Sequence, residues 1–292
     1  MGCLNPDQGF SHWFANIHLS GPCNRSCYFC IGQHMMALDA LDNLGSWPLA
    51  GLDEFVRRCR ARGVREVNVT GTNTEPLLYR HLPELRAALE RELGPGLVFG
   101  ARSNGVLVER RPELWRLFDK ASVTLCSADP QIYRQMMGQG APPRIDEIVS
   151  LSGHMRSLKV NVVLGPENTR DGDIYRTLDY LAECGIRRVN LREPYGQPHV
   201  GDPLAGHARA DYLERRLGMP IYAWREMEVC YWDVHYVEVE SINLYASGRV
   251  SETYPITKGY HPTGEVRSQE HFPGGRVAEQ WLGRARRRAA RG

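Results

Sequence analysis

Residues 12–34 read HWFANIHLSGPCNRSCYFCIGQH, a predicted strand followed by a loop that holds three of the eight cysteines of the chain. The first nine of these residues, 12–20, are mostly apolar and predict a β-strand. Cys23, Cys27 and Cys30 then fall within eight positions. Because clustered thiols can converge on a metal, this stretch indicates a metal or catalytic site directly after the first strand.

The composition is that of a globular protein of 292 residues, with 42% hydrophobic and 24% charged residues. The start, MGCLNPDQGFSHW, has no charged stretch followed by an apolar core, so we predict no secretory signal and a cytoplasmic protein. In a reducing cytosol, clustered cysteines are more often metal ligands or catalysts than disulfides. The sequence contains no run of eighteen or more apolar residues that could span a bilayer. Its net charge of +2 gives no reason to expect nucleic acid or a membrane as a partner.

Short apolar runs alternate with helical patterns over the first two thirds of the chain. Helices are predicted at residues 52–63 and 82–93, from Pro112, from Pro130 and at residues 173–185. Strands are predicted at residues 12–20, 65–71, 97–103, 122–128, 158–165 and 187–193. Six strand–helix steps of this kind predict a parallel sheet, which suits an incomplete barrel at least as well as an open doubly wound sheet.

The predicted strands are polar on one parity and apolar on the other, whereas parallel strands covered on both faces normally read as continuous apolar runs. An unpaired buried polar group costs roughly 1 to 3 kcal/mol, so we predict an interior that holds a polar ligand and water. The alternative is that several of these residues lie at strand ends and reach solvent. The polar parity comprises Asn16, His18, Asn68, Thr70, Arg102, Thr124, Cys126, Lys159, Asn161, Asn190 and Arg192.

The strand–helix rhythm stops after Pro194. Residues 234–256 alternate on both sides of Ser247 and Gly248, which predicts a β-hairpin. The chain ends in GRARRRAARG, a basic tail that reads as a frayed terminus or as a contact for something acidic. We therefore predict an N-terminal segment at residues 1–11, a barrel domain at 12–199 and a C-terminal extension at 200–292.

The cysteine loop has too few ligands for a closed zinc site, which takes four ligands, usually in two pairs. No second CxxC or HxxxH pair is visible in the sequence. Iron–sulfur clusters also normally take four cysteines. Three cysteines from the protein would leave one iron with an open position for another ligand.

The spacing CxxxCxxC, with Phe29 directly before the last cysteine, resembles the signature of the radical S-adenosylmethionine (SAM) superfamily. The resemblance covers roughly residues 12–195 and implies an α/β fold, a partial (β/α)6 TIM-type barrel. It implies a [4Fe-4S] cluster on Cys23, Cys27 and Cys30, with SAM on the remaining iron. It also implies an electron donor such as flavodoxin or ferredoxin, whose electron cleaves SAM to a 5′-deoxyadenosyl radical that abstracts a hydrogen atom from the substrate.

Further stretches resemble the family at the ends of predicted strands, where barrel enzymes build their sites. VTGTNTEPLL (69–78) keeps the first glycine, the acid and the proline of the family's GGEP turn, which receives the SAM amino group, but lacks the second glycine and has Thr72, Asn73 and Thr74 between Gly71 and Glu75. RSNG resembles its TNG turn and CSADP its SxD pattern, while KVNVVLGPEN is similar to the molybdopterin-precursor cyclase branch. An ordinary loop role is the alternative for each. The resemblance implies cofactor contacts for Phe29, Gly71, Glu75, Asn104, Ser127, Asp129 and Asn161.

Two other cysteines are candidates for a catalytic role, because some radical SAM epimerases use a cysteine to return a hydrogen atom to the substrate radical. They are Cys126, on the polar parity of the fourth strand, and Cys230 in the extension. A buried structural thiol is the alternative for both. Cys59 and Cys184 are predicted to be core thiols, and the extension has too few cysteines for an auxiliary cluster.

Arg192 ends the sixth predicted strand on the polar parity, and its guanidinium suits a carboxylate or phosphate of SAM or of the substrate. Lys159 and Arg102 share this parity, and ion pairs with acids such as Glu75 or Asp129 are the alternative. A polar, partly cationic interior predicts a small polar metabolite, namely a nucleotide, sugar, amino acid or aminoglycoside, that is oxidised, epimerised or rearranged. The alternatives are radical SAM modification of a peptide or RNA, and a non-catalytic iron–sulfur or zinc protein.

Overall fold

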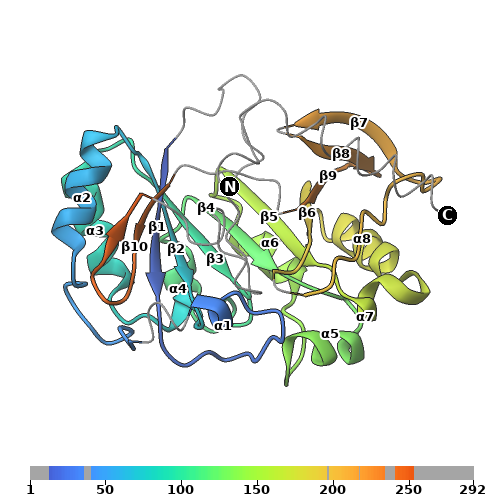
Figure 1. The fold of residues 1–292 in the computed structure, drawn as a ribbon, viewed down its shortest axis with the longest axis horizontal. Helices are drawn as coiled ribbons and strands as arrows, with labels where there is room; N and C mark the ends of the chain where they lie inside the picture. The colour runs from blue at the N-terminus through green and yellow to red at the C-terminus, as the bar shows by residue number, and fades with distance from the viewer. Residues whose placement is uncertain (1–12, 36–40, 196, 217, 234–240, 253–292) are drawn as a thin grey trace.

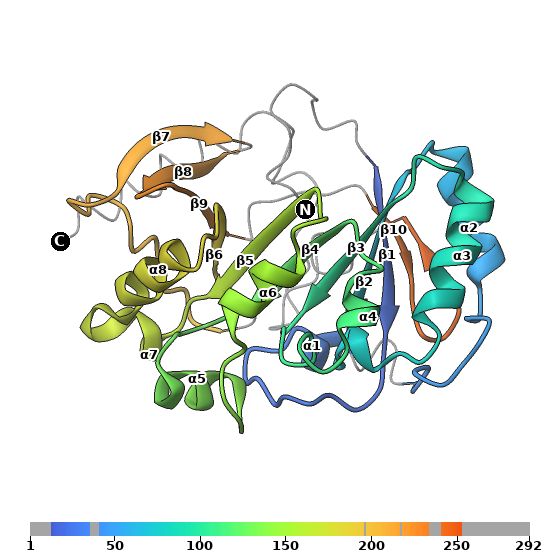
Figure 2. The same cartoon turned by 180° about the vertical axis from the view of Figure 1, so that it is seen from behind.

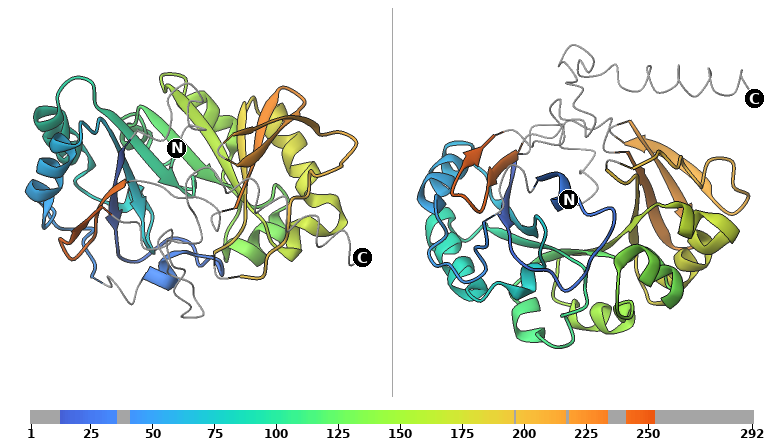
Figure 3. Two further views of the ribbon diagram at one scale, coloured as in Figure 1. Left: turned by 45° about the horizontal axis from the view of Figure 1, so that its top comes forward. Right: turned by 60° about the horizontal axis from the view of Figure 1, so that its bottom comes forward.

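The computed structural model describes residues 13–35, 41–195, 197–216, 218–233 and 241–252. They form a sheet with the strand order β11-β10-β1-β2-β3-β4-β5-β6-β9-β8-β7 (Figure 1). Neighbouring strands from β10 to β9 run parallel, and β11, β8 and β7 are antiparallel to the strands they join. The sheet is curved but not closed, and it forms the wall of a partial barrel (Figure 3).

The six predicted barrel strands are confirmed. They are β1 (Phe14–Leu19), β2 (Glu66–Gly71), β3 (Val98–Ser103), β4 (Lys120–Thr124), β5 (Ser157–Val163) and β6 (Arg188–Arg192). The fourth strand ends four residues earlier than predicted, at Thr124 rather than residue 128. The chain leaves the sheet there and turns into a helix that Asp129 caps, accepting hydrogen bonds from the backbone N–H groups of Gln131 and Ile132.

Helices α2 to α8 lie on the outer side of the curved sheet (Figure 2). The helices are α1 (Gly32–Met35), α2 (Leu52–Ala61), α3 (Leu82–Leu93), α4 (Pro112–Trp115), α5 (Pro130–Met137), α6 (Ile145–Leu151), α7 (Pro166–Thr169) and α8 (Asp173–Glu183), with 3-10 turns η1 (Pro76–Leu78) and η2 (Arg170–Gly172). The predicted helices are all present, and α3 ends at Gly94 with φ 83°, a backbone conformation that favours glycine. None of the described helices is long and apolar enough to cross a membrane.

The described part of the extension joins the sheet at both edges. β9 (Met227–Trp232) pairs in parallel with β6, and β8 (Met219–Trp224) and β7 (Asp211–Arg216) continue from it. β10 (Ser241–Leu244) pairs in parallel with β1 and forms the predicted hairpin with β11 (Val250–Ser251). The predicted N-terminal segment and basic tail lie outside the described residues, and the division into three parts stays a prediction.

The two parities of the barrel strands face different surroundings, as their sequences predict. The apolar parity packs into the core between sheet and helices, which removes its side chains from water. It comprises Ala15, Ile17, Val67, Val69, Phe99, Val123, Leu125, Val160, Val162, Leu164, Val189 and Leu191. Most of the polar parity instead lines a cavity on the concave side of the sheet.

His18 shares the polar parity but does not line the cavity, because the hairpin from the extension covers it. Its Nε2 lies 3.1 Å from Oδ1 of Asn243 in β10, and its ring stacks on Tyr245 with ring centroids 4.9 Å apart. The side chain is buried, at 2% exposure. Burial is the main reason that the pKa of His18 falls from 6.5 to about 4, and the charge of Arg102 adds to this while the bond to Asn243 opposes it.

This buried histidine should make the protein less stable in mild acid. Since the unfolded chain takes up the proton near pH 6.5 and the folded chain only near pH 4, stability falls as the pH falls through this interval. Between pH 7 and pH 5 the linkage amounts to about 2 kcal/mol. In urea unfolding at the two pH values, His18→Gln should lose about 2 kcal/mol less than the wild type. Equal losses in both proteins would contradict the assignment.

Candidate active site

A cavity of about 440 Å³ lies between the concave face of the sheet and the cysteine loop. Its volume is in the range of small-molecule sites. Phe29, Gly71, Glu75 and Asn104 line it, together with the three loop cysteines. Eight residues of the predicted polar parity also line it: Asn16, Thr70, Arg102, Thr124, Lys159, Asn161, Asn190 and Arg192.

The three loop cysteines face this cavity as free thiols. Cys27 Sγ lies 3.4 Å from the sulfur of Met137, and the thiol of Cys30 lies 3.7 Å from the backbone oxygen of Thr72. Burial raises the pKa of each thiol, and that of Cys27 reaches about 12, with the neighbouring thiols contributing. Without a metal the thiols therefore keep their protons at neutral pH, and a bound cation would replace those protons.

The cysteine loop is attached to the end of helix α5. The backbone N–H of Ser26 donates to the oxygen of Met137 at 3.2 Å, and Arg25 donates to the hydroxyl of Tyr133 at 3.1 Å. Gly138 makes this close approach possible, because a Cβ there would lie 2.1 Å from Oγ of Ser26. The loop is thus held by a helix that is remote in sequence.

A second loop, residues 71–75, closes the other side of the cysteine loop. A Cβ on Gly71 would lie 1.7 Å from the backbone oxygen of Thr74, so only glycine permits this turn. The start of α1 packs closely on the same loop, because a Cβ on Gly32 would lie 1.7 Å from the backbone oxygen of Thr72. Asn73 links this second loop to the end of β1, since its Oδ1 accepts hydrogen bonds from Ser20 Oγ at 2.9 Å and from the backbone N–H of Gly21 at 3.2 Å.

Glu75 lines the cavity with a buried carboxylate whose oxygens are bonded to the end of β3. Its Oε1 accepts a hydrogen bond from Ser103 Oγ at 2.6 Å, and its Oε2 accepts one from the backbone N–H of Asn104 at 2.8 Å. Burial raises the pKa of Glu75, and these hydrogen bonds oppose the rise. The carboxylate is therefore fixed in place beside the cysteine loop.

Comparison with known proteins connects this arrangement to a family. The radical SAM superfamily matches residues 17–181, more than half of the chain, and the match begins within β1 and includes the cysteine loop and strands β2 to β5. The chain belongs to the radical SAM superfamily. The resemblance to this family is confirmed, and the protein is a radical SAM enzyme that uses a [4Fe-4S] cluster and SAM.

Curated relatives of this radical SAM enzyme are cyclases, in agreement with the resemblance to a cyclase branch. The GTP 3′,8-cyclase of Paracoccus denitrificans is 34% identical over 215 residues, which are 70% of this chain and 59% of the cyclase. A probable GTP 3′,8-cyclase of Sulfurisphaera tokodaii is 30% identical over 207 residues, 69% of this chain and 62% of the relative. The chain thus matches about six tenths of the length of these relatives.

A solved structure shares the fold of this radical SAM enzyme. The crystal structure of Streptococcus suis SuiB aligns with a TM-score of 0.57 and 14% identity, covering 91% of this chain and 65% of that one. At this level of identity the likeness concerns the fold alone. It supports the partial barrel as the scaffold of the cavity.

The cysteine loop fits the cluster of a radical SAM enzyme. In a cubane cluster each thiolate binds a different iron, so the sulfurs must surround a common space rather than converge on one point. Cys23, Cys27 and Cys30 line the same cavity. Their thiols also interact electrostatically, because Cys23 and Cys30 raise the pKa of Cys27 and Cys30 raises the pKa of Cys23. Within the described ranges, no group of three or more His, Cys, Asp or Glu side chains is arranged to hold a single metal ion.

Five of the seven predicted cofactor contacts lie at the cavity wall: Phe29, Gly71, Glu75, Asn104 and Asn161. Asn104 also donates through Nδ2 to Oδ1 of Asn24 at 2.6 Å, which ties the end of β3 to the cysteine loop. Asn161 is 6% exposed, and its Oδ1 has no partner among the described residues. An unpaired buried acceptor at a cavity wall suits a bound ligand or water.

Ser127 and Asp129 do not line the cavity. The carboxylate of Asp129 caps α5, accepting from the backbone N–H of Gln131 at 2.7 Å and of Ile132 at 3.1 Å. Ser127 Oγ accepts from the backbone N–H of Asp129 at 2.9 Å. The predicted SxD pattern therefore makes a helix start, and a contact with SAM from these two residues stays a prediction.

The candidate hydrogen-returning cysteines also lie away from the cavity wall. Cys126 is fully buried beyond the end of β4, with its sulfur 3.5 Å from that of Met137, and burial raises its pKa well above the usual value. Cys230 is 3% exposed in β9. Cys59 is buried in the core, and Cys184 is partly buried. The structure thus places Cys126 and Cys230 as packed thiols.

The cations predicted from the strand parity do line the cavity. Arg102, Lys159 and Arg192 come from β3, β5 and β6. No ion pair joins Arg102 to an acid in the part of the chain that the structure describes, and both predicted acids, Glu75 and Asp129, are bonded elsewhere. The cavity wall therefore includes three cationic side chains.

Several residues at the cavity wall are not predicted from the sequence, among them Glu193, Tyr195 and Trp232. Glu193 follows the end of β6, so strand parity no longer applies to it. Trp232 belongs to β9, and nothing local indicates that a strand of the extension pairs with β6. The indole N–H of Trp232 has no partner among the described residues.

Proposed function

We propose that this radical SAM enzyme abstracts a hydrogen atom from a small anionic metabolite, with a nucleotide as the first candidate. The observation that carries the proposal is the set of three cations, Arg102, Lys159 and Arg192, around one cavity of small-molecule size. Guanidinium and ammonium groups on three different strands suit a phosphate or carboxylate. When bound at Cys23, Cys27 and Cys30, the cluster supplies the electron that cleaves SAM to a 5′-deoxyadenosyl radical.

The residues of the chain would supply position and exclusion of water. The loop around Glu75 and Asn104 fixes one side of the cysteine loop, and the end of α5 fixes the other. The cations lie on the barrel strands, so an anionic group bound to them would lie beside the cysteine loop within the same cavity. The relatives support a nucleotide, because they are cyclases named for GTP.

The test measures which compounds stimulate SAM cleavage by anaerobically reconstituted enzyme. GTP, other nucleotides, sugar phosphates, amino acids and an aminoglycoside are added singly, and 5′-deoxyadenosine is quantified by chromatography. A substrate should increase its formation and, when deuterated at the reacting carbon, transfer deuterium to it. Stimulation by a peptide or an RNA but by none of these metabolites would contradict the proposal.

The cation set predicts a matched pair of variants. Arg102→Gln should raise the concentration needed for half-maximal stimulation about tenfold or more, because a charge-assisted hydrogen bond is lost. Arg187→Gln is the control, since Arg187 is a surface residue, 61% exposed and paired with Glu226. Unchanged stimulation in Arg102→Gln would show that the anion does not bind there.

A further inference from the structure

A cluster of four titratable side chains lies where β6 and β9 end, and we name it the Glu193 cluster: Glu193, His199, Tyr231 and Asp233. The hydroxyl of Tyr231 donates to Oε1 of Glu193 at 2.7 Å. Nε2 of His199 lies 3.2 Å from Oδ2 of Asp233, 3.6 Å from Oε1 of Glu193 and 3.3 Å from the hydroxyl of Tyr231. The cluster thus joins the strand end of β6, the segment that follows it, and β9.

Glu193 holds the segment that follows β6. Its side chain is 1% exposed, and it accepts hydrogen bonds from the backbone N–H groups of Val200 at 3.0 Å and Gly201 at 2.6 Å. Together with Tyr231 it has three donors, two of them on backbone seven and eight residues further along the chain. A carboxylate with three donors is well satisfied although it is buried.

His199 connects the same segment to β9. Asp233 is as deeply buried as Glu193, with its side chain 1% exposed, while His199 is 36% exposed. Removing two carboxylates and an imidazole from water is costly. Apolar residues of similar size in their place would often give a fold that is at least as stable. The cost suggests that this arrangement is kept for the position it enforces.

The residues beside the cluster form one wall of the cavity. Pro194 and Tyr195 directly follow Glu193, and Trp232 lies between Tyr231 and Asp233; all three line the cavity. The backbone N–H of Glu193 donates to the oxygen of Trp232 at 3.0 Å, and Arg192 is the register partner of Trp232. Each wall segment is therefore flanked by residues of the Glu193 cluster.

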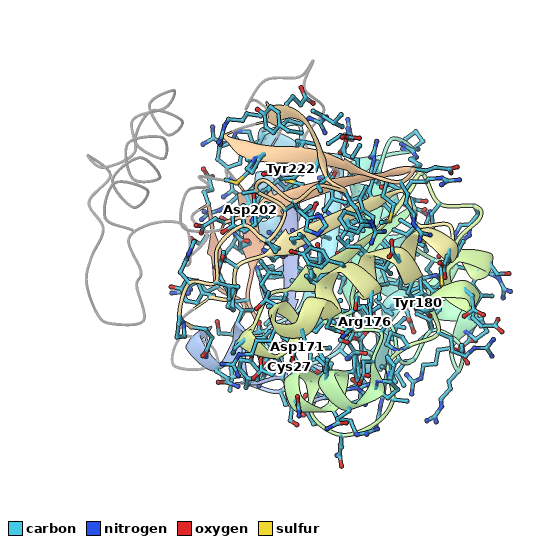
Figure 4. The ribbon with its side chains drawn as sticks, turned by 90° about the vertical axis from the view of Figure 1, so that its right-hand side faces the viewer. Cys27, Asp171, Arg176, Tyr180, Asp202 and Tyr222 are labelled. Atoms are coloured by element: carbon cyan, nitrogen blue, oxygen red, sulfur yellow. The ribbon has the colours of Figure 1, made fainter. Side chains whose placement is uncertain are left out.

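We infer that the Glu193 cluster positions the substrate wall of this radical SAM enzyme, that is, Tyr195 and Trp232. Glu193 and His199 are positioning residues that act through this wall. The inference rests on the proposed function, because it takes this end of the cavity to hold the substrate. Figure 4 shows Asp202 and Tyr222, which are hydrogen-bonded at 2.6 Å, well apart from Cys27 of the cysteine loop.

The experiment compares Glu193→Gln with Glu226→Gln in the full chain. The glutamine is isosteric but presents N–H groups to the donors, whereas Glu226 is 76% exposed and serves as the matched control. Amide exchange at Val200 and Gly201 should be about tenfold faster in Glu193→Gln. In protein labelled with 5-fluorotryptophan, the ¹⁹F signal lost in Trp232→Phe should shift or broaden, while the signal of Trp115, in the core, stays in place.

Two further readouts separate positioning from general stability. GTP, as the probe, should bind about tenfold more weakly to Glu193→Gln than to the wild type. His199→Gln, whose amide can replace Nε2 as a hydrogen-bonding group, should behave more like the wild type than His199→Ala does. Glu226→Gln should match the wild type throughout.

A wild-type Trp232 signal in Glu193→Gln, or unchanged amide exchange at Val200 and Gly201, would overturn the inference. If both change while GTP fails to bind even the wild type, the choice of a nucleotide in the proposed function fails instead. The two ideas therefore fail by different observations.

Discussion

Cys27→Ala should reduce 5′-deoxyadenosine formation by the reduced enzyme to background. The three loop thiols are the ligands available for the cluster, and Cys27 is one of the two that are partly buried, with its sulfur against Met137. Loss of one ligand leaves a cluster that is held by only two thiolates. The iron content of anaerobically reconstituted protein should fall from about four per chain, and this is measured together with the brown absorbance and the EPR signal of the reduced cluster.

Cys184→Ala is the control for this variant. Cys184 is also a partly buried free thiol, but it lies just after α8 and does not line the cavity. It should retain full iron content and full SAM cleavage. If Cys27→Ala cleaves SAM at the wild-type rate, the loop does not carry the catalytic cluster.

Gly71→Ala should both destabilise the protein and weaken SAM binding. The added Cβ would lie 1.7 Å from the backbone oxygen of Thr74, and backbone cannot rotate away as a flexible side chain can. Overpacking of this kind costs roughly 3 kcal/mol, which corresponds to a fall in melting temperature of roughly 5 to 10 °C. Because the displaced turn leads into Glu75, the SAM affinity measured by calorimetry under anaerobic conditions should fall at least about tenfold.

Gly45→Ala provides the comparison, because a Cβ at Gly45 meets nothing within 4 Å. This variant should melt within about 2 °C of the wild type and bind SAM normally. A Gly71→Ala protein with wild-type melting and SAM affinity would mean that the turn rearranges freely, and the placement of Glu75 would then not depend on it.

Much of the site follows from local sequence because its parts are local. The cysteine spacing lies within one loop, Gly71 ends a strand whose alternation is plain, and Glu75 and Asn104 each follow such a strand. In a parallel sheet the carboxyl ends of all strands lie at one edge, so these separate loops must meet there. The polar parity of the strands similarly predicts the cavity wall, since alternate side chains face opposite sides of a strand.

Strand parity does not predict which side chains line the cavity where a strand has ended or where another segment covers the strand. Cys126 lies two residues past the end of β4, so its sulfur packs on Met137 and not at the cavity wall. His18 lies within β1, but Asn243 and Tyr245 from the extension cover it. Asp129 shows the same limit for a motif, because the residues that resemble a SAM contact cap a helix instead.

The sequence by itself determined the barrel strands, the cysteine loop and the cationic character of the interior, because each depends on the spacing and periodicity of residues within short stretches. Only the tertiary structure decided that β9 and β10 of the extension complete both edges of the sheet and that Glu193, Tyr195 and Trp232 form a wall of the cavity. The pairing of β1 with β10 joins residues more than 220 positions apart. Such contacts depend on the packing of the whole chain, and no local pattern encodes them.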